Sequence, residues 1–353
     1  MNSKIIRLQD SLKQHGLDQL VVTSFYNLAY FADVRIHSGE RLLALLVDKE
    51  DKPVLFVNEL FTALPSEDYQ IVYFNDTNDP FDSIRPYLKG ERIAVDGNWT
   101  AGFLLRLMNC YSASYCDGTP LMADIRVIKD MNERELMQKA SLDNDEVMCR
   151  IKPFLQVGRT EMEIYNRLLE LFEEVTHEPV SFPPIVAFGK NAADPHHMSD
   201  DTVLQENQQV LIDMGSHYKG YCSDMTRTFL QKDDPKTEEI YDIVLKANLA
   251  AEAAVRPGVR FCDVDRAARK VIEDAGYGPY FTHRTGHGIG LEVHEPYDVS
   301  SSDELIIQEG MCFSIEPGIY LPGETGVRIE DLVICGKDGA IVLNHYTKEK
   351  QYF

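Results

Sequence analysis

Four acidic residues and one histidine in the C-terminal half of the chain lie in short apolar segments: VLIDMG, SDMTRTF, TGHGIG, FSIEPG and VRIED. They are Asp213, Asp224, His287, Glu316 and Glu330. Burying an unpaired charge in such a segment costs several kcal/mol, so the five groups need a common partner. Two divalent cations would be that partner, since four carboxylates contribute roughly −4 and two cations roughly +4. The pattern predicts a dinuclear metal site.

The types of these candidate ligands indicate both the metal and the chemistry. One nitrogen and several oxygens favour Mn²⁺ or Co²⁺, with Zn²⁺ as a further candidate, because structural zinc prefers Cys and His. Bridging carboxylates would hold two metals about 3.5–4 Å apart. A metal-bridging hydroxide would form near neutral pH and attack an acyl carbon, with one metal polarising the carbonyl oxygen. A nearby acid would carry the proton, so the site is typical of a hydrolase.

Each candidate ligand also has a simpler interpretation when it is taken singly. Asp213 could serve a turn, Asp224 could pair with Arg227, and His287 could be structural. The two glutamates could be solvated strand ends. Other metal and nucleotide motifs are disfavoured, because residues 286–290 lack the spacing G-x-G-x-x-G and the chain has no H-E-x-x-H. All five residues together are therefore interpreted as a metal site.

Three further histidines stand near this set in the sequence. His196 and His197 end the loop segment FGKNAADPHH, and His294 opens HEPY. His196 or His294 could donate a hydrogen bond to a substrate carbonyl or to the oxyanion that develops from it. A surface or supporting role remains the alternative for all three, and it is favoured for His197.

Composition limits the classes of partner. The 353 residues carry a formal net charge of −22, which disfavours nucleic acid and anionic membranes. Seven cysteines without C-x-x-C spacing indicate a reducing compartment. The amphipathic, charged N-terminal segment lacks the apolar stretch of a signal peptide, so we expect a cytoplasmic protein.

The pattern of apolar residues divides the chain into two expected domains, residues 1–122 and 123–353. The first alternates helical and strand-like runs, which predicts a small α/β domain. Its expected strands are 17–24, 42–48, 53–59 and 91–97. The second domain contains helical patterns at 133–151, after a Thr160–Glu163 capping box, at 234–255 and at 263–276.

Two segments of the second domain resemble one another. Residues 208–230 and 310–334 each read as strand, glycine-bearing turn, strand, and each carries two of the acids. A hairpin would bring the two acids of a segment to facing positions on one side of the strands. Because helices precede each segment, we expect a pseudo-twofold pair of αβ units with the metals at their junction.

Five segments together resemble the metallopeptidase family with the pita-bread fold, family M24: NAADPHH, LIDMGSHYKGYCSDMTRTF, GHGIGLEVHE, SIEPGIY and GVRIED. The family includes Xaa-Pro dipeptidases (prolidases), Xaa-Pro aminopeptidases and methionine aminopeptidases, and the resemblance covers residues 133–344. It implies that the five candidate residues ligate two metals, with Asp224 and Glu330 bridging and Glu316 as proton shuttle. It also implies that His196 and His294 bind substrate and stabilise the tetrahedral intermediate, and that Arg328 orients the site.

The separate N-terminal domain is similar to that of the proline-specific branch, in which this domain helps to form a homodimer. The expected substrates are Xaa-Pro peptides, whose scissile tertiary amide lacks an N–H. We expect an Xaa-Pro dipeptidase, with an Xaa-Pro aminopeptidase acting on longer peptides as the alternative. A non-catalytic binding module and a metal-free, creatinase-type hydrolase are remote alternatives, because all five ligand positions are kept.

One departure from the family pattern concerns the carboxylate of a dipeptide substrate. Prolidases usually place an arginine a few residues after the HE motif to bind that carboxylate, whereas residues 294–316 contain no Arg or Lys and Asp298 stands there. Arg35, His37 and Arg41 of a neighbouring subunit could replace it, or they could be plain surface residues. Without a clamp, the protein would be an aminopeptidase.

Overall fold

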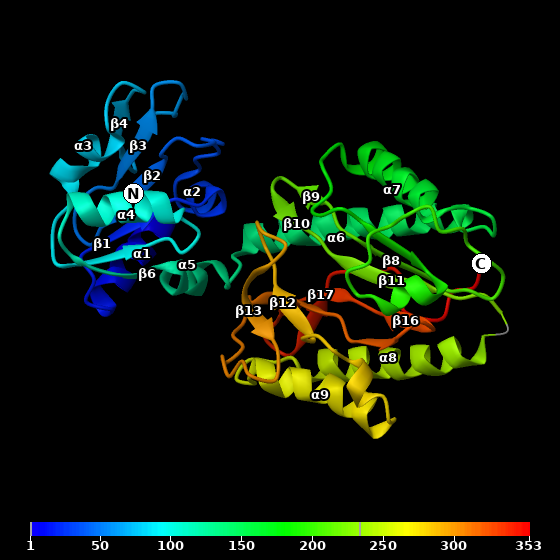
Figure 1. Ribbon diagram of the computed structural model, residues 1–353. Coiled ribbons are helices and arrows are strands. Elements are labelled where there is room, and N and C mark those ends of the chain that lie inside the picture. Colours follow the sequence, from blue (N-terminus) through cyan, green and yellow to red (C-terminus); the bar gives the residue numbers. More distant parts are fainter. Residues whose placement is uncertain (1, 233) are drawn as a thin grey trace. The chain divides into compact units, whose positions relative to one another are not determined.

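The computed structural model describes residues 2–232 and 234–353, which form two compact units divided between Arg126 and Val127 (Figure 1). Each unit has its own sheets and core. In the part of the chain that the structure describes, no helix is both long and apolar enough to cross a bilayer.

Unit 1 is built on a mixed six-stranded sheet of order β4-β3-β2-β1-β5-β6. Strands β1, β2 and β3 pair antiparallel, and the other neighbours are parallel. The strands are β1 (Gln19–Val22), β2 (Ala44–Asp48), β3 (Val54–Asn58), β4 (Gln70–Phe74), β5 (Arg92–Val95) and β6 (Ser114–Asp117). The helices are α1 (Ser3–Gln14), α2 (Phe25–Ala32), α3 (Pro80–Ile84), α4 (Ala101–Cys110) and α5 (Thr119–Arg126), with the 3₁₀ turn η1 (Arg85–Tyr87).

The central strands of this sheet are buried along their whole length, because helices cover them. Alternate residues such as Leu46 and Phe56 pack with Phe81 of α3 and Leu107 of α4 in one apolar cluster. The edge strands β4 and β6 are exposed or half-buried at every position except Phe74. The sequence pattern therefore predicts the buried strands and misses both edges.

Unit 2 is built on two larger sheets, each with its own pair of helices, and on two short strand pairs. The first sheet has the order β11-β8-β7, and the second has the order β13-β12-β14-β17-β18. The strands are β7 (Ile185–Phe188), β8 (Val210–Met214), β11 (Met225–Phe229), β12 (Gly286–Gly288), β13 (Glu295–Val299), β14 (Cys312–Ile315), β17 (Asp331–Cys335) and β18 (Ala340–Val342). The short pairs are β9 (His217–Tyr218) with β10 (Tyr221–Cys222), and β15 (Gly318–Leu321) with β16 (Thr325–Arg328).

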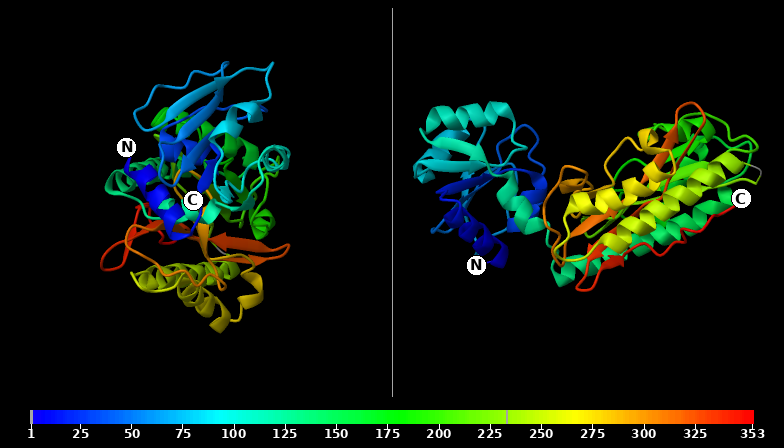
Figure 2. Two further views of the ribbon diagram at one scale, coloured as in Figure 1. Left: turned by 90° about the vertical axis from the view of Figure 1, so that its left-hand side faces the viewer. Right: turned by 90° about the horizontal axis from the view of Figure 1, so that it is seen from below.

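Four long helices supply the rest of the two cores. They are α6 (Met131–Ile151), α7 (Glu161–Thr176), α8 (Pro235–Ala254) and α9 (Phe261–Asp274), with the 3₁₀ turns η2 (Lys152–Phe154), η3 (Gly189–Ala193) and η4 (Gly278–Tyr280). The predicted capping box is confirmed, because the Thr160 side chain accepts from the Glu163 backbone and the Glu163 side chain accepts from Thr160. Helices α8 and α9 lie side by side (Figure 2).

The two halves of unit 2 follow one plan: a helix pair, an antiparallel strand pair and a short hairpin between its strands. Strands β8 and β11 enclose β9–β10, and β14 and β17 enclose β15–β16. Apolar residues of α6 and α7 pack on β7, β8 and β11, whereas those of α8 and α9 pack on β14 and β17. The fold is the expected pair of αβ units, and their sheets meet where the backbone N–H of Glu330 donates to Thr226 O at 3.1 Å.

Candidate metal and substrate site

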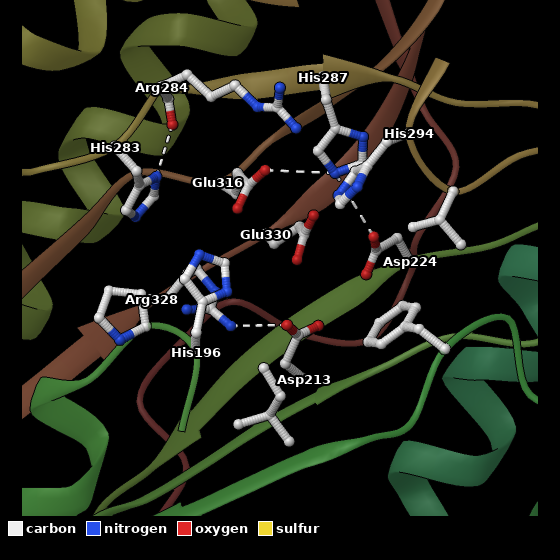
Figure 3. A pocket seen from close by; sticks show the side chains of 14 residues that line it. His196, Asp213, Asp224, His283, Arg284, His287, His294, Glu316, Arg328 and Glu330 are labelled. Carbon is white, nitrogen blue, oxygen red and sulfur yellow. Dashed lines mark hydrogen bonds and ion pairs between the residues drawn. The ribbon is translucent and has the colours of Figure 1, made fainter. Parts of the chain in front are cut away.

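A cavity of about 520 Å³ lies at the junction of the two αβ units (Figure 3). All eight residues expected to form the site line this cavity. Its lining is Phe182, Ile185, Pro195, His196, Asp213, Asp224, His283, Arg284, His287, Val293, His294, Glu316, Arg328 and Glu330.

The first αβ unit supplies two acids, one in strand β8 and one directly before strand β11. Asp213 is opposite Thr226 in the register, and Asp224 directly precedes β11, two residues from Thr226. Alternation along the strand therefore places both acids on one side of the pair. The expectation that the two acids face each other directly is wrong. Asp213 faces Thr226, and Asp224 lies two residues before Thr226, so the two acids are diagonal neighbours.

The second αβ unit supplies two glutamates next to a strand pair. Strands β14 and β17 pair Ile315 with Asp331, so Glu316 and Glu330 are the next residues beyond the last pair. The backbone N–H of Glu316 then donates to Thr285 O at 2.7 Å. This hydrogen bond holds the backbone of Glu316 in place directly after strand β14 ends.

His287 reaches the site because β12 approaches β14 closely. A Cβ atom on Gly286 would lie 1.9 Å from Ser314 O, so only glycine fits there. Nδ1 of His287 lies 3.1 Å from Gly288 O, which favours the tautomer with hydrogen on Nδ1. Its Nε2 then carries the lone pair and lies 3.7 Å from Asp224 Oδ2 and 3.4 Å from Glu316 Oε1. This is the arrangement of a metal-binding histidine.

In three carboxylates of the cluster, the two oxygens differ. One oxygen accepts a hydrogen bond or lies near His287, and the other has no hydrogen-bond partner among the described residues. Glu330 Oε2 accepts from Thr226 Oγ1 at 2.7 Å, and Asp213 Oδ2 accepts from Arg328 Nη2 at 2.7 Å. Asp213 Oδ1, Asp224 Oδ1 and Glu330 Oε1 are buried and make no hydrogen bond to any described residue. Buried polar atoms are nearly always paired, so these oxygens indicate a missing cationic partner.

The protonation equilibria of the cluster lead to the same conclusion. Burial and the neighbouring carboxylates raise the pKa of Asp224 and of Glu330 well above the usual range. Burial raises the pKa of Glu316 to about 7, against the positive charge of Arg328, and burial lowers the pKa of His287 to about 3. Divalent cations would stabilise the charged acids and the neutral imidazole. Candidate ligand atoms of Asp224, His287 and Glu330 all lie within 4.8 Å of one another, so the residues fit metal binding.

Arg328 connects the acids to side chains that the sequence pattern did not identify. Its guanidinium donates to Asp213, to Thr226 Oγ1 at 3.0 Å and to Tyr320 OH at 3.1 Å. The same hydroxyl of Tyr320 lies 2.8 Å from Nε2 of His283. Thr226 and Tyr320 stand inside segments that carry the resemblance, but their types alone gave no signal of a role.

His196 and His294 lie at the exposed edge of the cavity. The His294 ring packs edge-on against the His287 ring, with centroids 4.4 Å apart. Partial burial of the ring, followed by the charge of Arg284, lowers the pKa of His294, which favours the neutral ring. His197 points elsewhere: its Nε2 lies 2.6 Å from Oε2 of the buried Glu161.

The arginines considered as partners of Asp224 or of a substrate carboxylate have other partners in the described chain. Arg227 does not pair with Asp224; its guanidinium donates to Asp331 Oδ1 at 2.7 Å and to Glu330 O at 2.6 Å. Arg35 and Arg41 belong to unit 1, where they pair with Asp33 and with Asp76 and Glu40. His37 stacks on Phe25, with ring centroids 4.1 Å apart.

The fold and the site together define a metal-dependent hydrolase with a catalytic domain of two αβ units. Residues 135–337 match the model of metallopeptidase family M24, and residues 4–128 match that of the creatinase/prolidase N-terminal domain. The chain belongs to metallopeptidase family M24. The recognised family, the predicted fold class and the assignment as a metallopeptidase are confirmed.

Individual relatives are similar over nearly the whole chain. An uncharacterized peptidase of Staphylococcus aureus (strain USA300) is 37% identical over 352 residues, covering 98% of this chain and 100% of its own. The dipeptidase from Pyrococcus horikoshii OT3 superposes with a TM-score of 0.93 at 34% identity, covering 99% of this chain and 100% of that one. The prolidase from Thermococcus sibiricus gives 0.92 at 31% identity, with 100% of both chains covered.

Proposed function

We propose that this metallopeptidase is an Xaa-Pro dipeptidase that works with two divalent metal ions. The observation that carries the proposal is the buried cluster of four acids and His287, in which three carboxylate oxygens have no hydrogen-bond partner among the described residues. Such a cluster is costly unless cations occupy it. Membership of metallopeptidase family M24 explains why the chain keeps this cluster, because such a peptidase needs metal ligands.

The ligands in this proposal are Asp213, Asp224, His287, Glu316 and Glu330, with Asp224 and Glu330 shared between the two metals. The two shared residues come from different αβ units, which would place the metals at the junction. Bound metals would polarise the substrate carbonyl and lower the pKa of water to near neutrality. The predominance of oxygen ligands favours Mn²⁺ or Co²⁺ over Zn²⁺.

The side chains around the cluster would move the proton and bind the substrate. The carboxyl of Glu316 accepts from Ser314 Oγ at 3.1 Å, and in this proposal it would take a proton from the attacking water and return it to the leaving amine. His294 and His196, at the cavity edge, would donate hydrogen bonds to the carbonyl oxygen as negative charge develops on it. Arg328 would hold Asp213 in place through its hydrogen bond.

Substrate preference follows from the walls of the cavity and from the relatives. The lining includes four apolar side chains, those of Phe182, Ile185, Pro195 and Val293, and apolar surface of this kind suits a pyrrolidine ring. The solved relatives described above are named a dipeptidase and a prolidase, which favours Xaa-Pro dipeptides. A homodimer is proposed from the family resemblance, and a cytoplasmic location from the seven free cysteines.

The test compares hydrolysis of Ala-Pro, Ala-Pro-Ala and Ala-Ala by protein dialysed into Mn²⁺, with an EDTA-treated sample as control. Metal-dependent cleavage of Ala-Pro in clear preference to the other two is expected. Preference for Ala-Pro-Ala would identify an Xaa-Pro aminopeptidase instead. If the loaded protein cut Ala-Ala as fast as Ala-Pro, proline specificity would be wrong.

A further inference from the structure

A free carboxylate in the substrate is bound most strongly by a positively charged group in the cavity. The lining contains two side chains with permanent positive charge, Arg328 and Arg284. Arg328 is buried, and its hydrogen bonds to Thr226, Tyr320 and Asp213 use all three of its nitrogens. It cannot turn to a substrate without releasing Asp213. Arg284 is therefore the cation that remains for a ligand.

Arg284 is held at the cavity wall by a single partner. Its Nη1 donates to Asp298 Oδ1 at 2.6 Å, and the two side chains are 34% and 45% exposed. That is the one side-chain hydrogen bond that Arg284 makes within the described chain. A planar guanidinium with one nitrogen engaged still presents its other donors, which match the two oxygens of a carboxylate.

The position of this pair fits the length of a dipeptide. Arg284 precedes the candidate ligand His287 by three residues, and the register pairs His287 with Asp298. In Xaa-Pro the terminal carboxylate is one residue from the scissile bond, and one residue spans at most about 3.6 Å. The group that binds it must therefore lie beside the metal cluster. In Figure 3 the Arg284 guanidinium lies on the side of the cavity that carries His287 and His294.

We propose that Arg284 binds the free C-terminal carboxylate of the dipeptide, and that Asp298 orients Arg284 while competing with the substrate for it. The inference rests on the proposed function and adds the residue that selects dipeptides. A tripeptide places its carboxylate one residue further away, so it would lose this ion pair. Asp298 keeps the arginine extended and partly neutralised until substrate arrives.

The test uses two substrates of equal shape, Ala-Pro and its C-terminal amide Ala-Pro-NH₂, which lacks the negative charge. In metal-loaded Arg284→Gln, KM for Ala-Pro should rise roughly tenfold or more, since a charge-assisted hydrogen bond is lost. KM for the amide should change less than about twofold, because an uncharged group gains little from the guanidinium. Arg284→Lys should recover part of the preference for the acid, since it restores the charge without the fork.

Asp298→Asn is the matched variant on the opposite strand. It leaves Arg284 in place and removes its competitor, so KM for Ala-Pro should fall while KM for the amide stays constant. Metal content and thermal midpoint of each variant show whether the site and the fold are intact. A rise in KM for Ala-Pro in Asp298→Asn would overturn the competing role of Asp298.

Three possible results distinguish the role of Arg284 from the proposed dipeptidase function. If Arg284→Gln impaired the acid and the amide equally, or neither, while the wild type cut Ala-Pro, the carboxylate assignment would be wrong and the proposed function would stand. If the metal-loaded wild type cut neither substrate, the proposed function would fail and the inference with it. A selective loss on the acid supports both.

Discussion

Nη2 of Arg328 donates to Oδ2 of Asp213 at 2.7 Å, while Oδ1 of the same carboxylate has no hydrogen-bond partner among the described residues. The arginine therefore fixes one oxygen and leaves the other for a ligand. Because Arg328 also bonds Thr226, which in turn donates to Glu330, one guanidinium orients acids from both αβ units. Such outer contacts tune the geometry of a metal site.

Arg328→Lys tests this role. Lysine keeps the charge but cannot donate to three separate oxygens in one plane, so Asp213 should lose its orientation. Metal affinity should fall by about 10–100-fold, as is usual when an outer partner of a metal ligand is lost. Metal titration followed by calorimetry gives the affinity. Unchanged affinity would contradict the orienting role, and Arg266→Lys, at an exposed surface pair, is the control.

Asp224→Asn should abolish turnover and reduce the bound metal, because an amide cannot serve as a bridging anionic ligand. Bound metal is counted by elemental analysis, and turnover is measured with Ala-Pro. Asp274→Asn, which alters an exposed pair with Lys270, should change neither. Full activity in Asp224→Asn would exclude the dinuclear site.

The same substitution should stabilise the protein once metals are removed. The folded-state pKa of Asp224 is raised by burial and by Glu330, so the charged acid disfavours the folded state as pH rises above the carboxyl range of about 4. In EDTA at pH 8, Asp224→Asn should therefore unfold at a higher temperature than the wild type. The gain should shrink as pH falls and the wild-type acid regains its proton. A lower midpoint for the variant at pH 8 would contradict the raised pKa.

His294→Ala should lower kcat by roughly 10²-fold or more, which is typical for the loss of one donor to a developing oxyanion. The metal content should stay unchanged, since His294 is not one of the proposed ligands and its ring only contacts the ring of His287. Loss of metal would reassign His294 as a ligand. His217→Ala, at a partly exposed ring away from the cavity lining, serves as the control.

Glu161 is a positioning residue for the loop that carries His196. Its buried carboxylate accepts from His197 Nε2, from the backbone N–H of Asp200 at 3.1 Å and from that of Phe188 at 2.8 Å. Glu161→Gln should disturb the loop, reducing kcat and raising KM while metal content stays constant. If His196→Ala lowered the activity and Glu161→Gln did not, the positioning role would be wrong.

Several buried elements of the fold were predictable because they are read from local patterns, whereas the buried helix α2 and the strand β7 were not predicted. Strands such as β2 and β8 are apolar apart from one aspartate each, and α7 begins at a capping box. The strands β4 and β6 were missed because edge strands bury little apolar surface. The diagonal register of Asp213 and Asp224 was also missed, since it depends on the short β9–β10 pair between the two main strands.

Within the site, the acids and His287 were identifiable because ionisable groups in apolar segments are unusual. Thr226 and Tyr320 escaped notice, since a buried hydroxyl is ordinary in sequence and acquires a role only through its partners. Arg284 stands directly before the TGHGIG segment, but its place on the cavity wall follows from the pairing of β12 with β13. The roles of these three residues depend on contacts between segments that are distant in the sequence.

The two carboxylates proposed to be shared between the metals, Asp224 and Glu330, belong to different αβ units, each with its own helix pair and core. A bound metal pair would therefore act as a non-covalent cross-link between two separately packed halves. Removing it would loosen the seam between β11 and the segment around Glu330 before either core opened. Hydrogen exchange at the Glu330 amide, which bonds across that seam to Thr226, would then report metal occupancy without any substrate.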